Sequence, residues 1–214
     1  MRRHAWIVAL AGTAMLAAAA LPGPLAAQDK AAKATAKATA EAKPAAPAKK
    51  AKDRCKDGEP AEVAKYTVSK GKNLPASIDK PLASAAGDAN RGLGWMAHRR
   101  LGNCLACHEI SKVEELAKKQ GQIEVKTLDG KTAKMPLGVH GHIGPTLDGV
   151  AERYTEGELR MLVVNPKKIF PETIMPAFHR NSGFTTVHPD CEGLSILSAA
   201  QVEDVVSFLK TLKE

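Results

Sequence analysis

The chain has 214 residues and a formal net charge of +8, from 31 Lys and Arg against 23 Asp and Glu side chains. This length allows one compact domain with extensions at its ends. The only aromatic residues are two Trp, two Tyr and four Phe, and the basic run near the N-terminus contains none of them, which argues against a nucleic-acid-binding protein. A domain so poor in large side chains needs another apolar body to fill its interior.

The N-terminus has the pattern of a secretory signal peptide. Arg2 and Arg3 precede an apolar run over residues 6–21, and small residues follow up to Ala27. The run is shorter than the roughly 20 apolar residues that a bilayer requires, and prolines break it. We therefore predict a signal peptide over residues 1–27 that is cleaved near Ala27, no membrane span, and a mature protein in the periplasm.

Two segments separate the signal peptide from the predicted domain. Residues 28–54 are mostly Ala, Lys, Thr and Pro, with too little apolar bulk to offset the entropy lost on ordering, and this composition predicts a disordered tether. Residues 55–84 follow as an N-terminal extension. The folded domain is then expected to span residues 85–214, which is the size of one domain.

The first predicted helix runs from Asp88, a candidate N-cap, to Leu101, with Gly102 as its stop signal. It leads into the most informative stretch of the chain, Cys104-Leu105-Ala106-Cys107-His108, at residues 104–108.

Two cysteines three positions apart, followed at once by histidine, are the attachment signature of a c-type haem. One turn of helix places the thiols of Cys104 and Cys107 where they can add to the two vinyl groups, and it carries His108 beneath the ring as an iron ligand. A zinc site would need further thiols or imidazoles at ligand spacing, and a thioredoxin-like pair would need a βαβ context. The sequence offers neither, so it predicts one covalent haem c.

Three further elements follow in the sequence. Alternating apolar residues and the pair Asp129-Gly130 predict a small hairpin over residues 122–135, inserted in a loop. A capping box that begins at Thr155 opens a short helix ending near Asn165. A second capping box at residues 198–201 opens the terminal helix, whose apolar face consists of Val202, Val205, Val206, Leu209 and Leu212.

Haem iron has a second axial position, and we predict methionine there. Met175 precedes a proline in an irregular segment between two helices, where the chain can fold over the exposed haem face. Met135 also precedes a proline and is the rival ligand. Met96 and Met161 lie on the apolar stripes of predicted helices and are assigned to the core. A neutral thioether favours ferrous iron, so His–Met ligation predicts a relatively high reduction potential.

Other polar residues near the motif have predicted roles. A ligating histidine usually donates its second ring proton to a carbonyl or carboxylate, and Pro145 is the candidate partner of His108. His140 and His142, two positions apart in a glycine-rich loop, admit a metal site, but exposed loop histidines near a haem edge are the interpretation we favour.

Two cysteines remain after the haem motif has taken its pair. Free thiols of an exported protein are expected to become oxidised in the compartment outside the cytoplasm, so we predict a disulfide between Cys55 and Cys191. A reactive thiol at Cys191 is the alternative, but no neighbouring residue marks a lowered pKa of that thiol.

These features, in this order, resemble class I cytochromes c. Four strings, at residues 102–108, 143–154, 173–178 and 197–206, resemble the SoxX family more narrowly, the single-haem subunit of the SoxAX cytochrome complex of bacterial sulfur oxidation. The match covers about residues 85–214. It implies an all-α class I cytochrome c fold around one covalent haem, with a long N-terminal extension and a small hairpin insertion.

The resemblance also implies a function, that of the electron-transfer subunit of a heterodimeric L-cysteine S-thiosulfotransferase. A SoxA-like catalytic subunit would couple thiosulfate to a cysteine of a SoxYZ-like carrier, and the electrons would pass through this chain to a soluble cytochrome. Cys104 and Cys107 would bind the porphyrin, while His108 and Met175 hold the iron; no catalytic residue is implied. The residues alone also fit a free-standing periplasmic carrier of a respiratory chain, or a gas-binding or peroxidase-like haem protein with an open sixth site.

Overall fold

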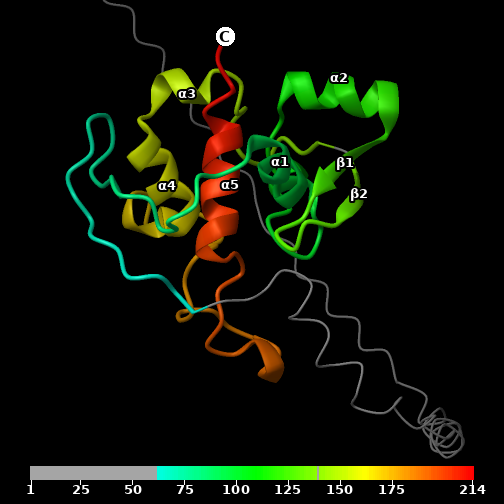
Figure 1. Ribbon diagram of the computed structural model, residues 1–214. Coiled ribbons are helices and arrows are strands. Elements are labelled where there is room, and N and C mark those ends of the chain that lie inside the picture. The colour runs from blue at the N-terminus through cyan, green and yellow to red at the C-terminus, as the bar shows by residue number, and fades with distance from the viewer. Residues whose placement is uncertain (1–61, 139) are drawn as a thin grey trace, which may run out of the picture. The chain divides into compact units, whose positions relative to one another are not determined.

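The computed structural model describes residues 62–138 and 140–214 (Figure 1). The predicted signal peptide, the tether and Cys55 lie outside the described residues. Within the described part, no helix is both long and apolar enough to cross a membrane.

The described residues form helices and one two-stranded sheet. The α-helices are α1 (Ala89–Ala97), α2 (Ser111–Gln120), α3 (Val150–Arg153), α4 (Glu156–Val164) and α5 (Ala199–Leu209). Short 3-10 helices are η2 (Cys104–Ala106), η3 (Pro166–Lys168) and η4 (Pro189–Cys191), and the strands are β1 (Gln122–Lys126) and β2 (Thr132–Pro136). The fold is therefore mainly helical, and the antiparallel sheet makes it not strictly all-α.

Helix α5 packs against both α1 and α4, and it lies between them in Figure 1. Its N-terminus is the predicted capping box, in which Ser198 accepts from the amide of Gln201 and Gln201 accepts from the amide of Ser198. The predicted apolar face is buried along its whole length, including Leu212, which lies beyond the last helical residue. This face is the centre of the hydrophobic core.

Helix α1 is fastened to α5 through one buried carboxylate. Asp204 on α5 is 1% exposed and accepts hydrogen bonds from the guanidinium of Arg91 at 2.8 Å, from the indole N–H of Trp95 at 2.9 Å and from the amide of Asp88 at 2.7 Å. The two helices also approach closely at Gly92, where a Cβ atom would lie 2.1 Å from the carbonyl oxygen of Asp204. Only glycine allows this separation.

Helix α1 begins after the predicted N-cap, Asp88, but it ends at Ala97 rather than at the predicted Leu101. The chain turns there because the amides of Leu101 and Asn103 both donate to the carbonyl oxygen of His98, at 3.1 Å each. Gly102 completes the turn, since a Cβ atom at this residue would lie 2.5 Å from a backbone oxygen of α1. The early end brings the haem motif back against the helix.

The predicted hairpin is confirmed. Strands β1 and β2 pair antiparallel with Ile123 opposite Met135, and Gly130 adopts the left-handed backbone that the turn requires, with φ of 79°. The sheet packs against α1, where Gly94 leaves room for the side chain of Val125.

Residues 64–82, named here the N-terminal strap, belong to the folded unit. Ile78 in the strap is completely buried, and its amide donates to the carbonyl oxygen of Gly157 at 3.0 Å. Glu158 accepts from the amides of Asn73 and Leu74 as well as from Thr155 in the capping box of α4. One acidic side chain therefore holds both the strap and a helix start.

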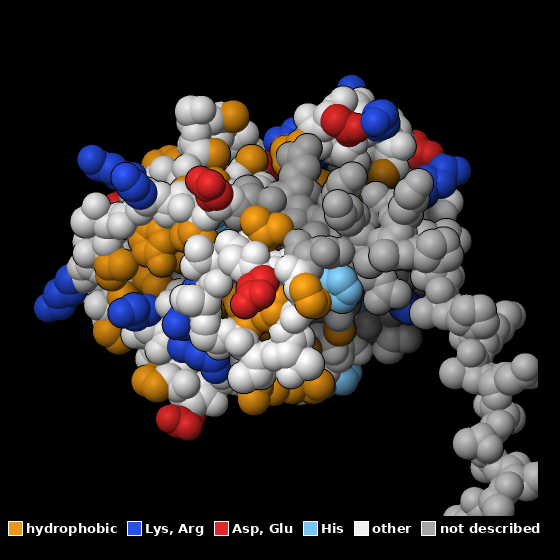
Figure 2. Space-filling model, turned by 90° about the horizontal axis from the view of Figure 1, so that it is seen from below, with side chains coloured by type: hydrophobic (Ala, Val, Ile, Leu, Met, Phe, Trp, Pro, Cys, Tyr) orange, Lys and Arg blue, Asp and Glu red, His pale blue; other side chains and the backbone are white. Residues whose placement is uncertain are grey.

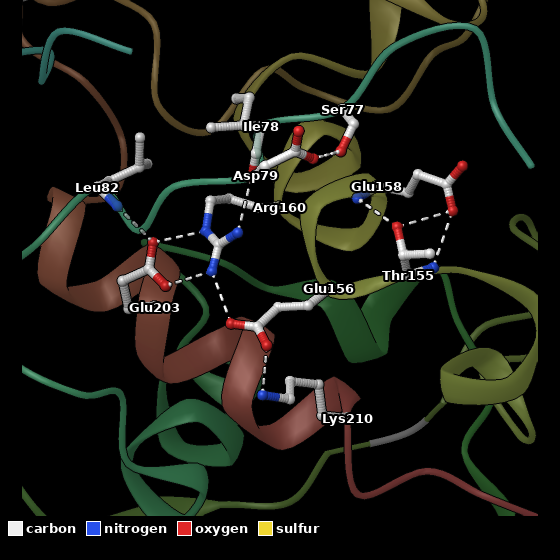
Figure 3. Close-up of polar contacts among 10 residues, drawn as sticks. All are labelled: Ser77, Ile78, Asp79, Leu82, Thr155, Glu156, Glu158, Arg160, Glu203 and Lys210. Atoms are coloured by element: carbon white, nitrogen blue, oxygen red, sulfur yellow. Dashed lines mark hydrogen bonds and ion pairs between the residues drawn. The ribbon is translucent and has the colours of Figure 1, made fainter. Parts of the chain in front are cut away.

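A buried guanidinium joins the strap to α4 and α5 (Figure 3). Arg160 on α4 is 0% exposed and donates to the carbonyl oxygen of Ile78 at 2.7 Å, to both carboxylate oxygens of Glu203 on α5 and to Glu156. Glu203 also accepts from the amide of Leu82 at 2.8 Å. Each buried charge in this network thus has charged or backbone partners.

The start of the strap is held by a buried imidazole. His179 is 0% exposed; its Nε2 accepts from the amide of Ala64 at 2.9 Å, and its Nδ1 lies 2.8 Å from the carbonyl oxygen of Leu197. This pattern fits the neutral ring with the proton on Nδ1. Burial lowers the pKa of His179 below its ordinary value of 6.5.

We expect His179 to make the protein less stable in weak acid. The unfolded chain binds this proton near pH 6.5 and the folded chain only at lower pH, so the contribution is fully present above about pH 6.5 and is lost as the pH falls toward the folded pKa. Urea unfolding at about pH 7.5 and about pH 5.5 should show a steeper loss for the wild type than for His179→Gln, by at most about 1.4 kcal/mol per pH unit. Equal pH dependence of both proteins would contradict the assignment.

Candidate haem-attachment site

The haem motif forms a single tight turn. Helix η2 covers Cys104–Ala106, and the amides of Cys107 and His108 both donate to the carbonyl oxygen of Cys104, at 3.1 and 3.0 Å. Asn103 enters this turn with a left-handed backbone, φ of 46°. The turn presents two thiols and one imidazole from five consecutive residues, as the spacing predicted.

Both thiols of the motif are free and half-buried. Burial raises the pKa of the Cys104 thiol to about 12, and the nearby Cys107 adds to the effect. Cys104 is therefore a protonated thiol at neutral pH.

The imidazole of His108 lies in a cradle formed by Gly144 and Pro145. Nδ1 of His108 lies 2.7 Å from the carbonyl oxygen of Pro145, which is the contact expected from the sequence. Gly144 donates its amide to the carbonyl oxygen of Cys107 at 2.8 Å, and a Cβ atom on Gly144 would lie 2.4 Å from the ring. The site thus fixes the ring through Nδ1, and Nε2 makes no hydrogen bond with another described residue.

The cradle is held in place by a charged side chain that the sequence did not single out for this role. Arg153 on α3 donates to the carbonyl oxygens of Asp148 at 2.6 Å and Thr146 at 2.8 Å, directly after Pro145. The carboxylate of Asp148 in turn accepts from the amide and hydroxyl of Ser111. These bonds fix the loop that presents the Pro145 carbonyl to His108.

The structure separates Met175 from the other methionines. Met96 and Met161 are in the core as predicted, 1% and 0% exposed, and Met135 is buried on β2 opposite Ile123. Met175 is half-buried in an irregular segment and packs against the edge of the core. Of the four candidates, it alone lies outside a helix or strand.

The two loop histidines differ in their surroundings. His142 is exposed, and its Nδ1 lies 3.2 Å from a carboxylate oxygen of Glu109. His140 is 9% exposed, which corrects the expectation of an exposed side chain, and neither of its ring nitrogens has a hydrogen-bond partner among the described residues. It is drawn inward because Gly141 donates to the carbonyl oxygen of Leu105 and packs against the motif. No described group of three acidic, His or Cys residues is placed to hold a metal ion.

The residues present fit a covalently attached haem. The turn offers two free thiols, Gly144 leaves room for the flat imidazole of His108, and the irregular segment offers a soft thioether ligand. Two of the most exposed large apolar residues adjoin these elements: Ile143, 69% exposed, precedes the cradle, and Ile174, 80% exposed, precedes Met175. Figure 2 shows that hydrophobic side chains also gather on one face of the described part. A contiguous exposed apolar patch is typical of a binding surface.

Cys191 ends helix η4 and is not one of the free cysteines of the described part. Its predicted partner, Cys55, lies outside the described residues, so the disulfide between them stays a prediction.

Two comparisons with known proteins found matches to this chain. The family model for cytochrome c matches residues 99–213. A chain of the crystal structure of SoxXA from P. pantotrophus is 32% identical, with a TM-score of 0.54; the match covers 72% of the present chain and 100% of the P. pantotrophus chain. A search of curated proteins found no match.

The family match includes the haem turn, the histidine cradle, the methionine segment and the terminal helix. Proteins of this family carry a covalent haem c. The match that covers the whole of a SoxXA chain indicates which group of cytochromes c this chain resembles. The chain therefore belongs to the cytochrome c family, as a SoxX-like monohaem cytochrome.

Proposed function

We propose that this chain is the electron-transfer subunit of a periplasmic SoxAX-type L-cysteine S-thiosulfotransferase. The observation that carries the proposal is the match to the whole length of a SoxXA chain at 32% identity. The predicted export signal supports the periplasmic location. The partners would be a SoxA-like catalytic cytochrome, a SoxYZ-like sulfur carrier and a soluble acceptor cytochrome.

Four residues would hold the cofactor. Cys104 and Cys107 would form the thioether bonds, His108 would ligate iron through Nε2, and Met175 would take the opposite axial position. Bound haem supplies a one-electron ferric/ferrous couple, with a potential raised by the thioether ligand. Pro145 would hold the proton of His108 on Nδ1 and so keep Nε2 directed toward the metal.

The electron count defines what the subunit must do. Joining a carrier thiol to thiosulfate forms one S–S bond, releases the thiol proton and yields two electrons. A chain with a single one-electron site cannot store both, so it must pass the first to an acceptor before it takes the second. Ile143, next in sequence to Gly144, and Ile174, next to Met175, are both exposed and would be available for such repeated docking.

Reconstitution with thiosulfate tests this function directly. The haem-loaded chain, mixed with its SoxA-like subunit and a SoxYZ-like carrier, should be reduced when thiosulfate is added, as followed by its visible absorption. Leaving out the carrier should prevent the reduction. A free-standing respiratory carrier is the second candidate, and it predicts no reduction even in the complete mixture and no complex with the SoxA-like subunit.

Replacing both motif cysteines should abolish covalent haem attachment. In Cys104→Ala/Cys107→Ala the porphyrin has no thioether bond, so acid acetone should extract all colour from the denatured protein. The wild type and the control variant Cys191→Ala should keep their colour. Colour retained by the double variant, or colour lost from Cys191→Ala alone, would contradict the assignment of the attachment residues.

A further inference from the structure

The segment that carries Met175 has little apolar anchoring of its own. Between the buried residues Ile169 and Ala177, residues 170–176 are all exposed or half-buried, and Ile174 is 80% exposed. A segment with so few buried contacts opens easily unless hydrogen bonds hold it.

Beside the backbone hydrogen bonds from the amide of Thr173 to Phe170 and from that of Phe170 to Pro166, two hydrogen bonds that involve side chains connect Met175 to η3. The amide of Met175 donates to the hydroxyl of Thr173 at 3.2 Å, and the ammonium of Lys167 donates to the carbonyl oxygen of Thr173 at 2.5 Å. Lys167 lies on η3, which begins at the buried Pro166 and is separated from α4 only by Asn165. Within the described part, Lys167 is the one side chain outside residues 170–176 that bonds to this segment.

We propose that Lys167 is the positioning residue of the axial methionine: its ammonium holds Thr173, and Thr173 holds the backbone of Met175 at the site. This inference rests on the proposed function, because it takes Met175 as an iron ligand. A charged donor makes a stronger hydrogen bond than a neutral one, so its loss should let the segment open more often. The side chain is exposed, so salt should weaken the effect.

Imidazole binding to the ferric, haem-loaded protein measures this opening, because an added ligand binds iron only after methionine has left. We expect Lys167→Ala to tighten the apparent imidazole affinity about threefold to tenfold, the range for one lost hydrogen bond at an exposed site. The long-wavelength methionine–iron absorption band should disappear at correspondingly lower imidazole. Lys167→Arg, which keeps a charged donor, should restore the wild-type affinity.

Lys168 provides the matched control. It lies next to Lys167 on the same turn and is also exposed, but its side chain makes no hydrogen bond or ion pair with another described residue. Lys168→Ala removes the same charge and should leave imidazole affinity unchanged, and urea stability should be equal in both variants.

The possible results distinguish a failure of this inference from a failure of the proposed function. An equal shift of the imidazole affinity in Lys167→Ala and Lys168→Ala would assign the effect to net charge and overturn the positioning role of Lys167. An unchanged imidazole affinity in Lys167→Ala would overturn it as well. A wild-type ferric protein without the methionine–iron band would overturn Met175 as an iron ligand, and with it the positioning role of Lys167. Loss of thiosulfate-dependent reduction in a protein that keeps the band would contradict only the enzymatic role.

Discussion

Replacing Arg160 with methionine should lower the free energy of unfolding by about 3–5 kcal/mol, the range for removing one partner from a buried ion pair. The side chain is completely buried, and its loss leaves the carboxylate of Glu203 and the carbonyl oxygen of Ile78 without their charged donor. Burial by itself lowers the pKa of Arg160, but its carboxylate partners raise it overall, so the group stays charged in the folded protein. Urea unfolding of the haem-loaded protein at neutral pH measures the loss.

Lys210→Met is the matched control, since it removes another cation from the same network. Lys210 contacts only the outer carboxylate, Glu156, and both side chains are nearly half exposed. Water screens such a pair, so the expected loss is below about 1 kcal/mol. Equal losses in Arg160→Met and Lys210→Met would contradict the central place of the buried guanidinium.

The starts of the helices could be predicted because the signals for them are local. At α4 and α5, a hydroxyl and a side-chain acceptor three residues later satisfy the first free amides, and both boxes are formed in the structure. Helix α2 had no such signal: its N-cap, Ile110, makes no side-chain cap, and Val113 is its only buried residue. A helix that buries only one side chain has no apolar residues recurring at helical spacing, so the sequence pattern does not indicate it.

The strap could not be predicted because its order comes from distant partners. Its backbone is held by Glu158, Arg160 and Glu203, which lie about 80 to 120 positions further along the chain. Nothing in the composition of residues 64–82 indicates that Ile78 is completely buried. Acidic and basic residues on helices are usually exposed to solvent, but here the strap covers Glu158, Arg160 and Glu203.

The site was predictable where spacing carries the chemistry. The turn from Cys104 to His108 and the carbonyl of Pro145 were both expected, because each depends on neighbouring residues or on a known need of the ligand. The role of Arg153 was missed, because its guanidinium reaches the carbonyl oxygens of Asp148 and Thr146 only in the folded structure. Its one signal was its place in the string at residues 143–154 that resembles SoxX.

Met175→Leu should convert this protein into a low-potential haem protein with an open axial position. Leucine keeps the volume but cannot ligate iron, so the methionine–iron band should vanish and the reduction potential should fall by on the order of 0.1 V or more, within the roughly 0.8 V that axial ligands span. Met135→Leu is the matched control: that side chain packs in the hairpin opposite Ile123, so the band and the potential should stay unchanged. Redox titration followed by visible absorption measures both, and a band lost from Met135→Leu but kept in Met175→Leu would move the ligand to the hairpin.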